Sequence, residues 1–414
     1  MKFRSDLWRH RDFLNVWAAE TISVFGSQFY LVAMPLAAIL ALDASPADMG
    51  LLFAIEMSPF LLVGLLAGVL ADRKERRKIM IICDFGRAFT LAVIPVAWYF
   101  NTLNWPIMFA VAFAAGVFTT FFDIAYQAYL PVLVKRNQLL DANSKLETSR
   151  ATSQVAGPGS AGLVVDIVGA PFALIADSVS FVASAILLLR VKKREIIDRM
   201  NVHEPVVAEI REGLRIVFSN PTLRGIAGCT STSNLFGSMS FALMVLFMAD
   251  SLQLSSIWIG AIFMVGAVGG VTGALISPRF TSRIGLGKAI IVSAAFSGIP
   301  VIALILAYPS NALIVFMPMM FVAGLLTVIY NVNQVSLRQA ITPDHLQGKM
   351  NATMRFLVWG VFPIGGLIGG YLGEIFGIKT AILISGIGIL FSFIWLTISK
   401  VHQIETIPEY QAAA

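Results

Sequence analysis

The stretch GVLADRKERRK, residues 68–78, interrupts an otherwise apolar part of the sequence. Asp72 comes first, and the basic residues that follow it are interrupted only by Glu75. Apolar runs flank the stretch at 49–71 and 79–100, and each exceeds the roughly 20 residues that a helix needs to cross a bilayer. The stretch therefore predicts a short turn between two membrane-spanning helices. Its basic character favours the cytoplasmic side of the membrane.

Further apolar runs extend in both directions from this turn. The first is too long for a signal peptide, so we expect a first helix that is retained. The fifth and eleventh runs are Gly-rich and begin with polar residues, but they have the length of a span. The twelve predicted spans are residues 13–42, 49–71, 79–100, 106–133, 141–168, 171–190, 222–250, 256–278, 287–308, 311–336, 348–375 and 378–400.

The composition argues against a soluble protein. Of 414 residues, 57% are hydrophobic and 13% are charged, which is about half the charge of soluble domains. The two cysteines, Cys83 and Cys229, lie in apolar stretches and form no disulfide framework or metal pattern. No phosphate-binding G-x-x-x-x-G-K-[ST] motif and no catalytic dyad occurs. We therefore expect neither an enzyme nor an ATP-driven pump, and no cofactor or metal.

The positions of the basic residues give the orientation. With the N-terminus inside, the predicted cytoplasmic segments and helix ends hold 28 of the 30 Lys and Arg residues. The exceptions are Arg87 in the third span and Lys379 in the last outer loop. This alternation is typical of the positive-inside rule. The net charge of +6 is therefore interpreted as membrane orientation rather than nucleic-acid binding, and both termini are predicted to be cytoplasmic.

A polar segment divides the spans into two sets of six. We predict an N-terminal six-helix bundle over 1–190, a cytoplasmic linker over 191–220 and a C-terminal six-helix bundle over 221–414. Within the linker, residues 206–218 have apolar positions at helical spacing and are expected to lie along a surface. An offset of 208 pairs Gly157 with Gly365, Gly162 with Gly370 and Gly169 with Gly377. These pairs indicate a duplicated six-helix unit, an architecture known in transporters.

The turn at 68–78 resembles the signature of the major facilitator superfamily, close to G-x-L-A-D-R-x-G-R-R. The sequence departs from this pattern at Glu75, where the family has glycine. The resemblance implies an all-α membrane protein of twelve helices in two pseudo-symmetric bundles. It also implies that the loop latches the two halves on the cytoplasmic side. The gate residues carried over in this way are Gly68, Asp72, Arg73, Arg76 and Arg77.

The fifth span contains Gly157-Pro158-Gly159-Ser160-Ala161-Gly162. Taken alone, these residues indicate a kinked and closely packed helix, because proline removes a helical hydrogen bond and glycine thins the helix. They also resemble the antiporter motif G-P-x-x-G-G of the same superfamily, with Ala161 in place of one glycine. The resemblance implies a gate that favours export in exchange for protons, carried by Gly157, Pro158 and Gly162.

The stretches at 25–29, 123–131 and 140–144 are similar to the bacterial macrolide-efflux and enterobactin-exporter branch of the superfamily. This similarity extends over essentially the whole chain. It implies export of an amphiphilic small molecule, such as a drug, a macrolide-like compound or a siderophore. The arginine that the family usually carries in its fourth helix is absent.

Acidic residues inside a span are candidate proton carriers, since each costs about 2.5–3.5 kcal/mol at a helix centre. Glu20 in the first span and Asp123 in the fourth lie at comparable depth, and we predict that both couple transport to protons. The alternative is that each pairs with a cation or with the backbone. Asp84 and Arg87, three residues apart, are expected to form an ion pair. Together with Arg150, they are predicted to support the charged turn.

The second half has no acid deep in a span and supplies uncharged polar groups instead. Alternating access around a midplane site would bring such groups to the substrate. Each candidate can equally serve packing between helices. The predicted cavity residues are Phe25, Gln28, Tyr126, Asn234, Asn331 and Asn333.

These observations predict a secondary transporter of the bacterial inner membrane, coupled to protons and acting on a small molecule in the bilayer. We expect it to act as a monomer without a nucleic-acid partner. An uptake symporter or a uniporter of the same fold is the main alternative.

Overall fold

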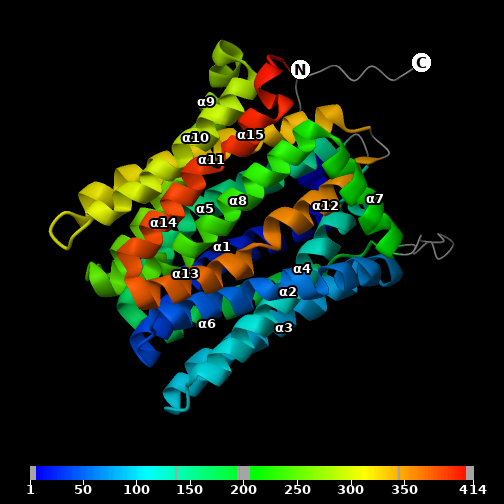
Figure 1. Cartoon of the computed structure of the whole chain (residues 1–414). Coiled ribbons are helices and arrows are strands. Elements are labelled where there is room, and N and C mark those ends of the chain that lie inside the picture. The colour runs from blue at the N-terminus through cyan, green and yellow to red at the C-terminus, as the bar shows by residue number, and fades with distance from the viewer. Residues whose placement is uncertain (1–5, 136–137, 194, 196–205, 344–345, 407–414) are drawn as a thin grey trace. The chain divides into compact units, whose positions relative to one another are not determined.

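The computed structural model describes residues 6–135, 138–193, 195, 206–343 and 346–406, and every regular element within these ranges is a helix (Figure 1). The first six long helices precede a shorter helix, α7, and the remaining helices follow it. Short 3₁₀ and π turns extend several of them. The helices are α1 (Arg11–Leu42), α2 (Pro46–Arg73), α3 (Arg76–Tyr99), α4 (Trp105–Leu133), α5 (Leu139–Val168), α6 (Ala170–Leu189), α7 (Val206–Ser219), α8 (Pro221–Leu246), α9 (Ser256–Ile284), α10 (Leu286–Ala303), α11 (Ala312–Ile341), α12 (Gln347–Trp359), α13 (Phe362–Phe376), α14 (Ile378–Phe391) and α15 (Ile394–Ile398).

Eleven helical segments in the described ranges are long and apolar enough to cross a membrane. Two of them are built from consecutive helices, namely α12 with α13 and α14 with α15. The predicted fifth span, α5, is not among the eleven, although its 30 residues give it sufficient length. The reason is its first half, which runs from Asp141 to Gln154 and is rich in polar residues. This polar half becomes important below.

Helix ends follow local chemistry. The side chain of Asn104 accepts a hydrogen bond from the Ile107 backbone N–H (3.1 Å) and so caps the start of α4. Asn220 caps α8 in the same way through the Thr222 N–H (2.9 Å). At the other end, α5 and α13 stop at Gly169 and Gly377, whose φ of +86° favours glycine. The internal repeat pairs these two glycines at an offset of 208, and both have the same backbone conformation in the structure.

The helices group into two compact units. The first contains residues 1–44, 55–201 and 254–264, and the second contains residues 45–54, 202–253 and 265–414. The division falls near the predicted linker, and two short segments group with the opposite unit. As a result, α2 and α9 each contribute residues to both units. Within the first unit, α1 packs on α5 and α6, and α6 also packs on α3.

Each of the two short segments that group with the opposite unit packs there through a pair of glycines. In the first unit, Gly260 of α9 faces Gly162 of α5, and a Cβ built at Gly162 would lie 3.1 Å from the Gly260 Cα. In the second unit, Gly50 of α2 faces Gly370 of α13, and a Cβ built at Gly370 would lie 2.8 Å from the Gly50 Cα. Gly162 and Gly370 are the positions that the internal repeat pairs. Their equivalent contacts support a duplicated six-helix unit.

The short helix α7 lies in the predicted linker and packs on α8 and α12. Val217 is fully buried and belongs to a hydrophobic cluster with Met350 and Met354. Glu212 of α7 forms an ion pair with Lys349 of α12. The helix therefore docks on the second unit through its apolar face.

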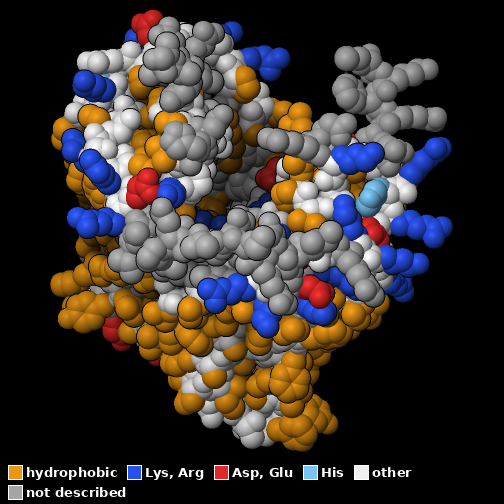
Figure 2. All heavy atoms as spheres, turned by 90° about the vertical axis from the view of Figure 1, so that its right-hand side faces the viewer, with side chains coloured by type: hydrophobic (Ala, Val, Ile, Leu, Met, Phe, Trp, Pro, Cys, Tyr) orange, Lys and Arg blue, Asp and Glu red, His pale blue; other side chains and the backbone are white. Residues whose placement is uncertain are grey.

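Charge is unevenly distributed over the surface. In Figure 2 the Lys and Arg side chains gather on part of the surface, and a broad area of hydrophobic side chains lies beside it. Exposed large hydrophobic residues occur on most of the long helices, for example Phe89, Ile167, Val179, Leu275 and Ile314. Such a surface suits a protein surrounded by lipid.

The glycine contacts give a first prediction, tested on one helix. A Cβ at Gly50 would lie 2.5 Å from the Gly366 carbonyl oxygen and 2.6 Å from the Gly370 Cα, whereas a Cβ at Gly64 would meet nothing within 4 Å. We expect Gly50→Ala to destabilise the protein by about 1–3 kcal/mol through overpacking. Gly64→Ala is the matched control and should be neutral, or stabilising by up to about 1 kcal/mol. Thermal unfolding in detergent measures both, and equal midpoints would contradict the packing described here.

Candidate functional site

An ion pair between a buried carboxylate and an exposed arginine links the first and fifth helices. Glu20 of α1 is 7% exposed. Its Oε1 lies 3.4 Å from Nη2 of Arg150 in the polar half of α5. Sequence analysis offered Arg150 as a support for the charged turn, whereas the structure places it against the predicted proton carrier. A carboxylate this deep in a helix bundle needs such a partner, because lipid and apolar side chains offer none.

Asp123 and Tyr126 of α4 complete the surroundings of Glu20. The charge of Asp123 acts on both Glu20 and Arg150, and Asp123 itself is half-buried. Tyr126 lies one turn further along α4, is buried, and stacks on Phe122 with ring centroids 6.2 Å apart. The two predicted proton carriers therefore interact electrostatically with each other and with Arg150.

The predicted pair of Asp84 and Arg87 is present and fully buried. Arg87 donates to Asp84 within α3, and the Ser184 hydroxyl of α6 donates to the other carboxylate oxygen at 2.7 Å. The Arg87 guanidinium also lies between the rings of Phe122 (4.2 Å) and Phe181 (4.0 Å). These contacts join α3, α4 and α6, which makes the pair a structural element of the bundle.

Acidic groups outnumber guanidinium groups around this pair. Glu20, Asp84 and Asp123 interact electrostatically with Arg87 and Arg150, and the buried Asp177 interacts with Asp84 and Arg87. Glu147 also acts on Arg150, and both of these residues are exposed.

The predicted gate residues make contacts within the first unit. Arg76 forms an ion pair with Glu195 at 2.6 Å, and Arg77 donates to the carbonyl oxygens of Leu188 and Leu189 at the end of α6. These bonds fasten the turn between α2 and α3 to the end of α6. Arg73 is exposed, and a Cβ at Gly68 would meet nothing within 4 Å. The side chain of Asp72 lies outside the described part of the structure, so the latch stays a prediction.

The glycine–proline motif of α5 lies at two helix contacts. Gly157 packs against the side chain of Gln28 on α1, and Gly162 packs against Gly260 on α9. The Pro158 carbonyl also faces Gly260. The motif therefore allows α5 to approach both neighbours closely. Gln28, a predicted cavity residue, packs at this helix contact and donates to the Val24 carbonyl (3.3 Å).

The predicted cavity residues of the second unit are mostly engaged in hydrogen bonds between helices. Asn333 donates to the Ser277 hydroxyl (3.0 Å) and accepts from Thr281 (2.8 Å), which ties α11 to α9. Asn234 donates to the Val358 carbonyl at the end of α12 (2.7 Å). Asn331 is exposed and accepts from Gln334 (3.4 Å). Their contact with a substrate stays a prediction.

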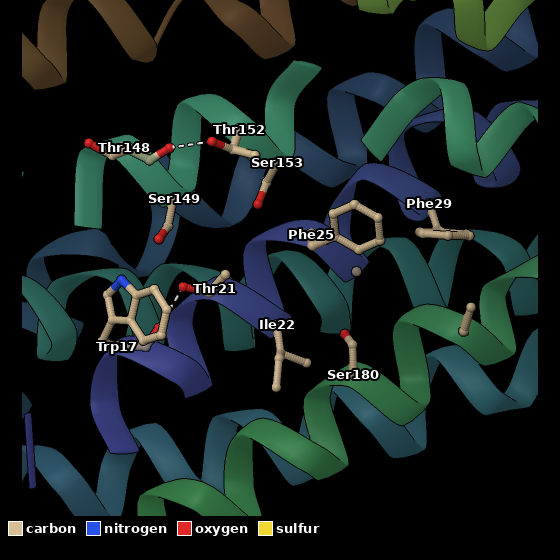
Figure 3. Close-up of a pocket in the computed structure, with 12 residues that line it drawn as sticks. Trp17, Thr21, Ile22, Phe25, Phe29, Thr148, Ser149, Thr152, Ser153 and Ser180 are labelled. Carbon is tan, nitrogen blue, oxygen red and sulfur yellow. Dashed lines mark hydrogen bonds between the residues drawn. The ribbon is translucent and has the colours of Figure 1, made fainter. Parts of the chain in front are cut away.

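A groove between α5 and α6, with α1 as its floor, is visible in Figure 3. We call it the α1–α5–α6 groove, and its volume is about 550 Å³. Phe25, a predicted cavity residue, lines it together with Trp17, Ile22 and Phe29 of the same helix. The wall formed by α5 carries hydroxyl side chains, namely Thr148, Ser149, Thr152 and Ser153.

Sequence reasoning offered Phe25 and Phe29 as walls of a cavity and missed the other groove residues. Charged and amide side chains were chosen as candidates because their burial is costly. Hydroxyl side chains are common in helices and were not chosen. A signal was present in α5, where the hydroxyl residues at 148, 149, 152 and 153 share one helical face. On α1, aromatic residues at 17, 25 and 29 also share a face. Neither pattern shows which helices meet, so the groove needed the structure.

Comparison with known proteins agrees with this architecture. Residues 6–412 match the family described as transmembrane secretion effector. The chain is 28% identical over 390 residues to the multidrug efflux pump Tap of Mycolicibacterium fortuitum, an alignment that covers 89% of this chain and 91% of that protein. It is 24% identical over 385 residues to macrolide efflux protein A of Streptococcus pyogenes, with 90% and 92% covered.

Solved structures show the same fold. A bacterial homologue of the iron transporter ferroportin, in an inward-facing state, matches with a TM-score of 0.77 at 16% identity and covers 94% of this chain and 98% of its own. A bacterial homologue of the lysosomal transporter Spinster matches with a TM-score of 0.72 at 14% identity, covering 98% and 99%. The predicted all-α transporter fold and the resemblance to efflux proteins are confirmed. The chain belongs to the transmembrane secretion effector family of the major facilitator superfamily, and it is an efflux transporter of that fold.

Proposed function

We propose that this protein exports an amphiphilic small molecule in exchange for protons, with Glu20 as the principal proton carrier. The observation that carries the proposal is the ion pair of the buried Glu20 with Arg150, which bridges α1 and α5. Acidic groups outnumber guanidinium groups around it. Protonation of Glu20 removes the attraction to Arg150 and lets the two helices separate.

The relatives support the substrate class. The names of two of them specify multidrug and macrolide efflux, and both activities concern molecules with large apolar parts and a few polar groups. The aromatic and hydroxyl lining of the groove on α1, α5 and α6 suits the same class. An amphiphile is therefore the substrate that this chain is best equipped to handle.

Alternating access also has a local basis. Gly50 at one end of α2 is packed against α13, while Cβ atoms at Gly64 and Gly68 near the other end would meet nothing within 4 Å. A glycine face without neighbours can receive another helix when the transporter changes state. We propose that this face, beside the predicted latch, closes in the opposite state of the transport cycle.

The orientation follows from the basic residues. The turn between α2 and α3 and the ends of α4, α6 and α9 carry Lys and Arg. We propose that this side faces the cytoplasm of a bacterial cell and that both termini lie there. The transporter would act as a monomer, since one chain supplies both six-helix sets.

Removal of the Glu20 carboxylate tests the coupling. We expect Glu20→Gln to lower ΔpH-driven uptake of ethidium and erythromycin into everted membrane vesicles about tenfold or more, because a neutral amide cannot carry the proton that drives exchange. Asp166→Asn is the matched control, since Asp166 is an exposed acid on α5, and its uptake should stay within about twofold. Undiminished ΔpH-driven uptake in Glu20→Gln would remove Glu20 from the mechanism. Uptake into intact cells along the same gradient would indicate an import symporter.

The buried pair on α3 should behave differently. Arg87→Leu leaves Asp84 without its cation in a buried position, which costs about 3–5 kcal/mol in comparable cases. We therefore expect a large drop in the thermal unfolding midpoint in detergent. The double variant Asp84→Leu with Arg87→Leu removes both charges and should recover most of that loss, with coupled transport retained. Loss of coupling in a stable double variant would show that the pair takes part in proton transfer.

A further inference from the structure

The α1–α5–α6 groove opens beside a surface that is suited to lipid. One face of α6 carries a stripe of exposed apolar residues, including Ile175, Val179 and Ile186. Ala176 lies next to this stripe, is exposed, and lines the groove. Ile22, on the floor of the groove, is also exposed at 38%. A molecule dissolved in the bilayer can therefore reach the groove from the side, between α5 and α6.

Four hydroxyl groups of the groove present acceptors rather than donors. Thr21 donates to the Trp17 carbonyl (2.7 Å), Thr148 to the Ser144 carbonyl (2.8 Å) and Thr152 to the Thr148 carbonyl (2.8 Å). Ser180 donates in the same way to the Asp177 carbonyl (2.7 Å). The hydrogens of these four hydroxyl groups are thus used within their own helices, and the oxygen lone pairs remain. An occupant that donates hydrogen bonds or carries positive charge fits such a lining.

The aromatic and acidic groups point to the same occupant. Trp17, Phe25 and Phe29 offer ring surfaces, which attract cations as well as other rings. Behind Ser180 lies the Asp177 carboxyl group, 1% exposed, whose Oδ2 has no hydrogen-bond partner among the described residues. Among the residues that the structure describes, no Lys or Arg lines the groove. The guanidinium of Arg150, on the neighbouring α5 face, is turned to Glu20.

We infer that the α1–α5–α6 groove binds the ring-bearing, positively charged part of an amphiphile that reaches it from the bilayer. Its volume of about 550 Å³ lies within the roughly 300–1,000 Å³ of drug-sized sites. A phospholipid acyl chain has neither rings nor donors and leaves the hydroxyl oxygens of the lining unmatched. This inference rests on the proposed export function and names the substrate class and its route to the site.

The groove also explains how an occupant can affect the proton carrier. The same two helices, α1 and α5, border the groove on one side and carry the pair of Glu20 and Arg150 on another. The distance between α1 and α5 therefore bears on both the 3.4 Å pair and the width of the groove.

The test uses two ions of similar shape and opposite charge, tetraphenylphosphonium and tetraphenylborate. Equilibrium binding to the full-length protein in phospholipid nanodiscs, with empty nanodiscs subtracted, gives the dissociation constant of each. We expect saturable binding of the cation and binding of the anion at least about tenfold weaker. Ala176→Trp fills the groove and should weaken cation binding about tenfold or more. Thr152→Trp on the opposite wall serves as a second blocking variant.

Val179→Trp is the matched control, because Val179 lies on the exposed stripe of the same helix and outside the groove. It should leave cation binding within about twofold of the unmodified protein. Absence of saturable cation binding would overturn the inference, as would equal binding of the two ions or unchanged binding in both blocking variants. Glu20→Gln separates the two proposals, since it should abolish coupled transport and retain cation binding. Transport that persists in Glu20→Gln but fails in Ala176→Trp would reject the proton carrier and keep the groove.

Discussion

The hydrocarbon core of a membrane offers no hydrogen bonds, so each polar group inside a span must find its partner within the protein. This constraint accounts for most polar contacts of the chain. Asp84 is held by Arg87 and Ser184, Asn333 ties α11 to α9, and hydroxyl groups donate to carbonyls one turn earlier. Where partners are complete, the polar group serves the fold. Two places where polar groups are not fully matched, namely the acids around Glu20 and the acceptors of the groove, are where we expect function.

The fifth helix, α5, carries more polar residues than a span surrounded by lipid would tolerate. Its first half is too polar to qualify as a membrane span by hydropathy, yet it places Arg150 against Glu20 and a row of hydroxyl groups in the groove. Its second half is apolar and glycine-rich and packs against α1 and α9. One helix thus combines a closely packed, glycine-rich half with a polar half that lines the groove. This division explains why the span was the weakest in the hydropathy pattern.

Much of the fold could be predicted from the sequence, because lipid imposes helices of fixed length and basic residues set their orientation. The Asp84–Arg87 pair was also predictable, since spacing on one helix determines which side chains meet. The partner of Arg150 was not, because contacts between α1 and α5 depend on how helices pack. For the same reason the hydrogen bonds of Asn333 with Ser277 and Thr281 could not be predicted. The sequence shows which polar side chains lie inside membrane spans. The packing of the helices decides which partners they meet.

The arrangement of α1 suggests why coupling needs no long pathway through the protein. One part of this helix carries Glu20 toward Arg150, and another carries Trp17, Phe25 and Phe29 into the groove. Both sites depend on the distance between α1 and α5. A proton on Glu20 weakens the attraction between the helices. Exchange requires the amphiphile to favour the opposite state, and a ligand that prefers one state of a two-state element biases every site that depends on that element.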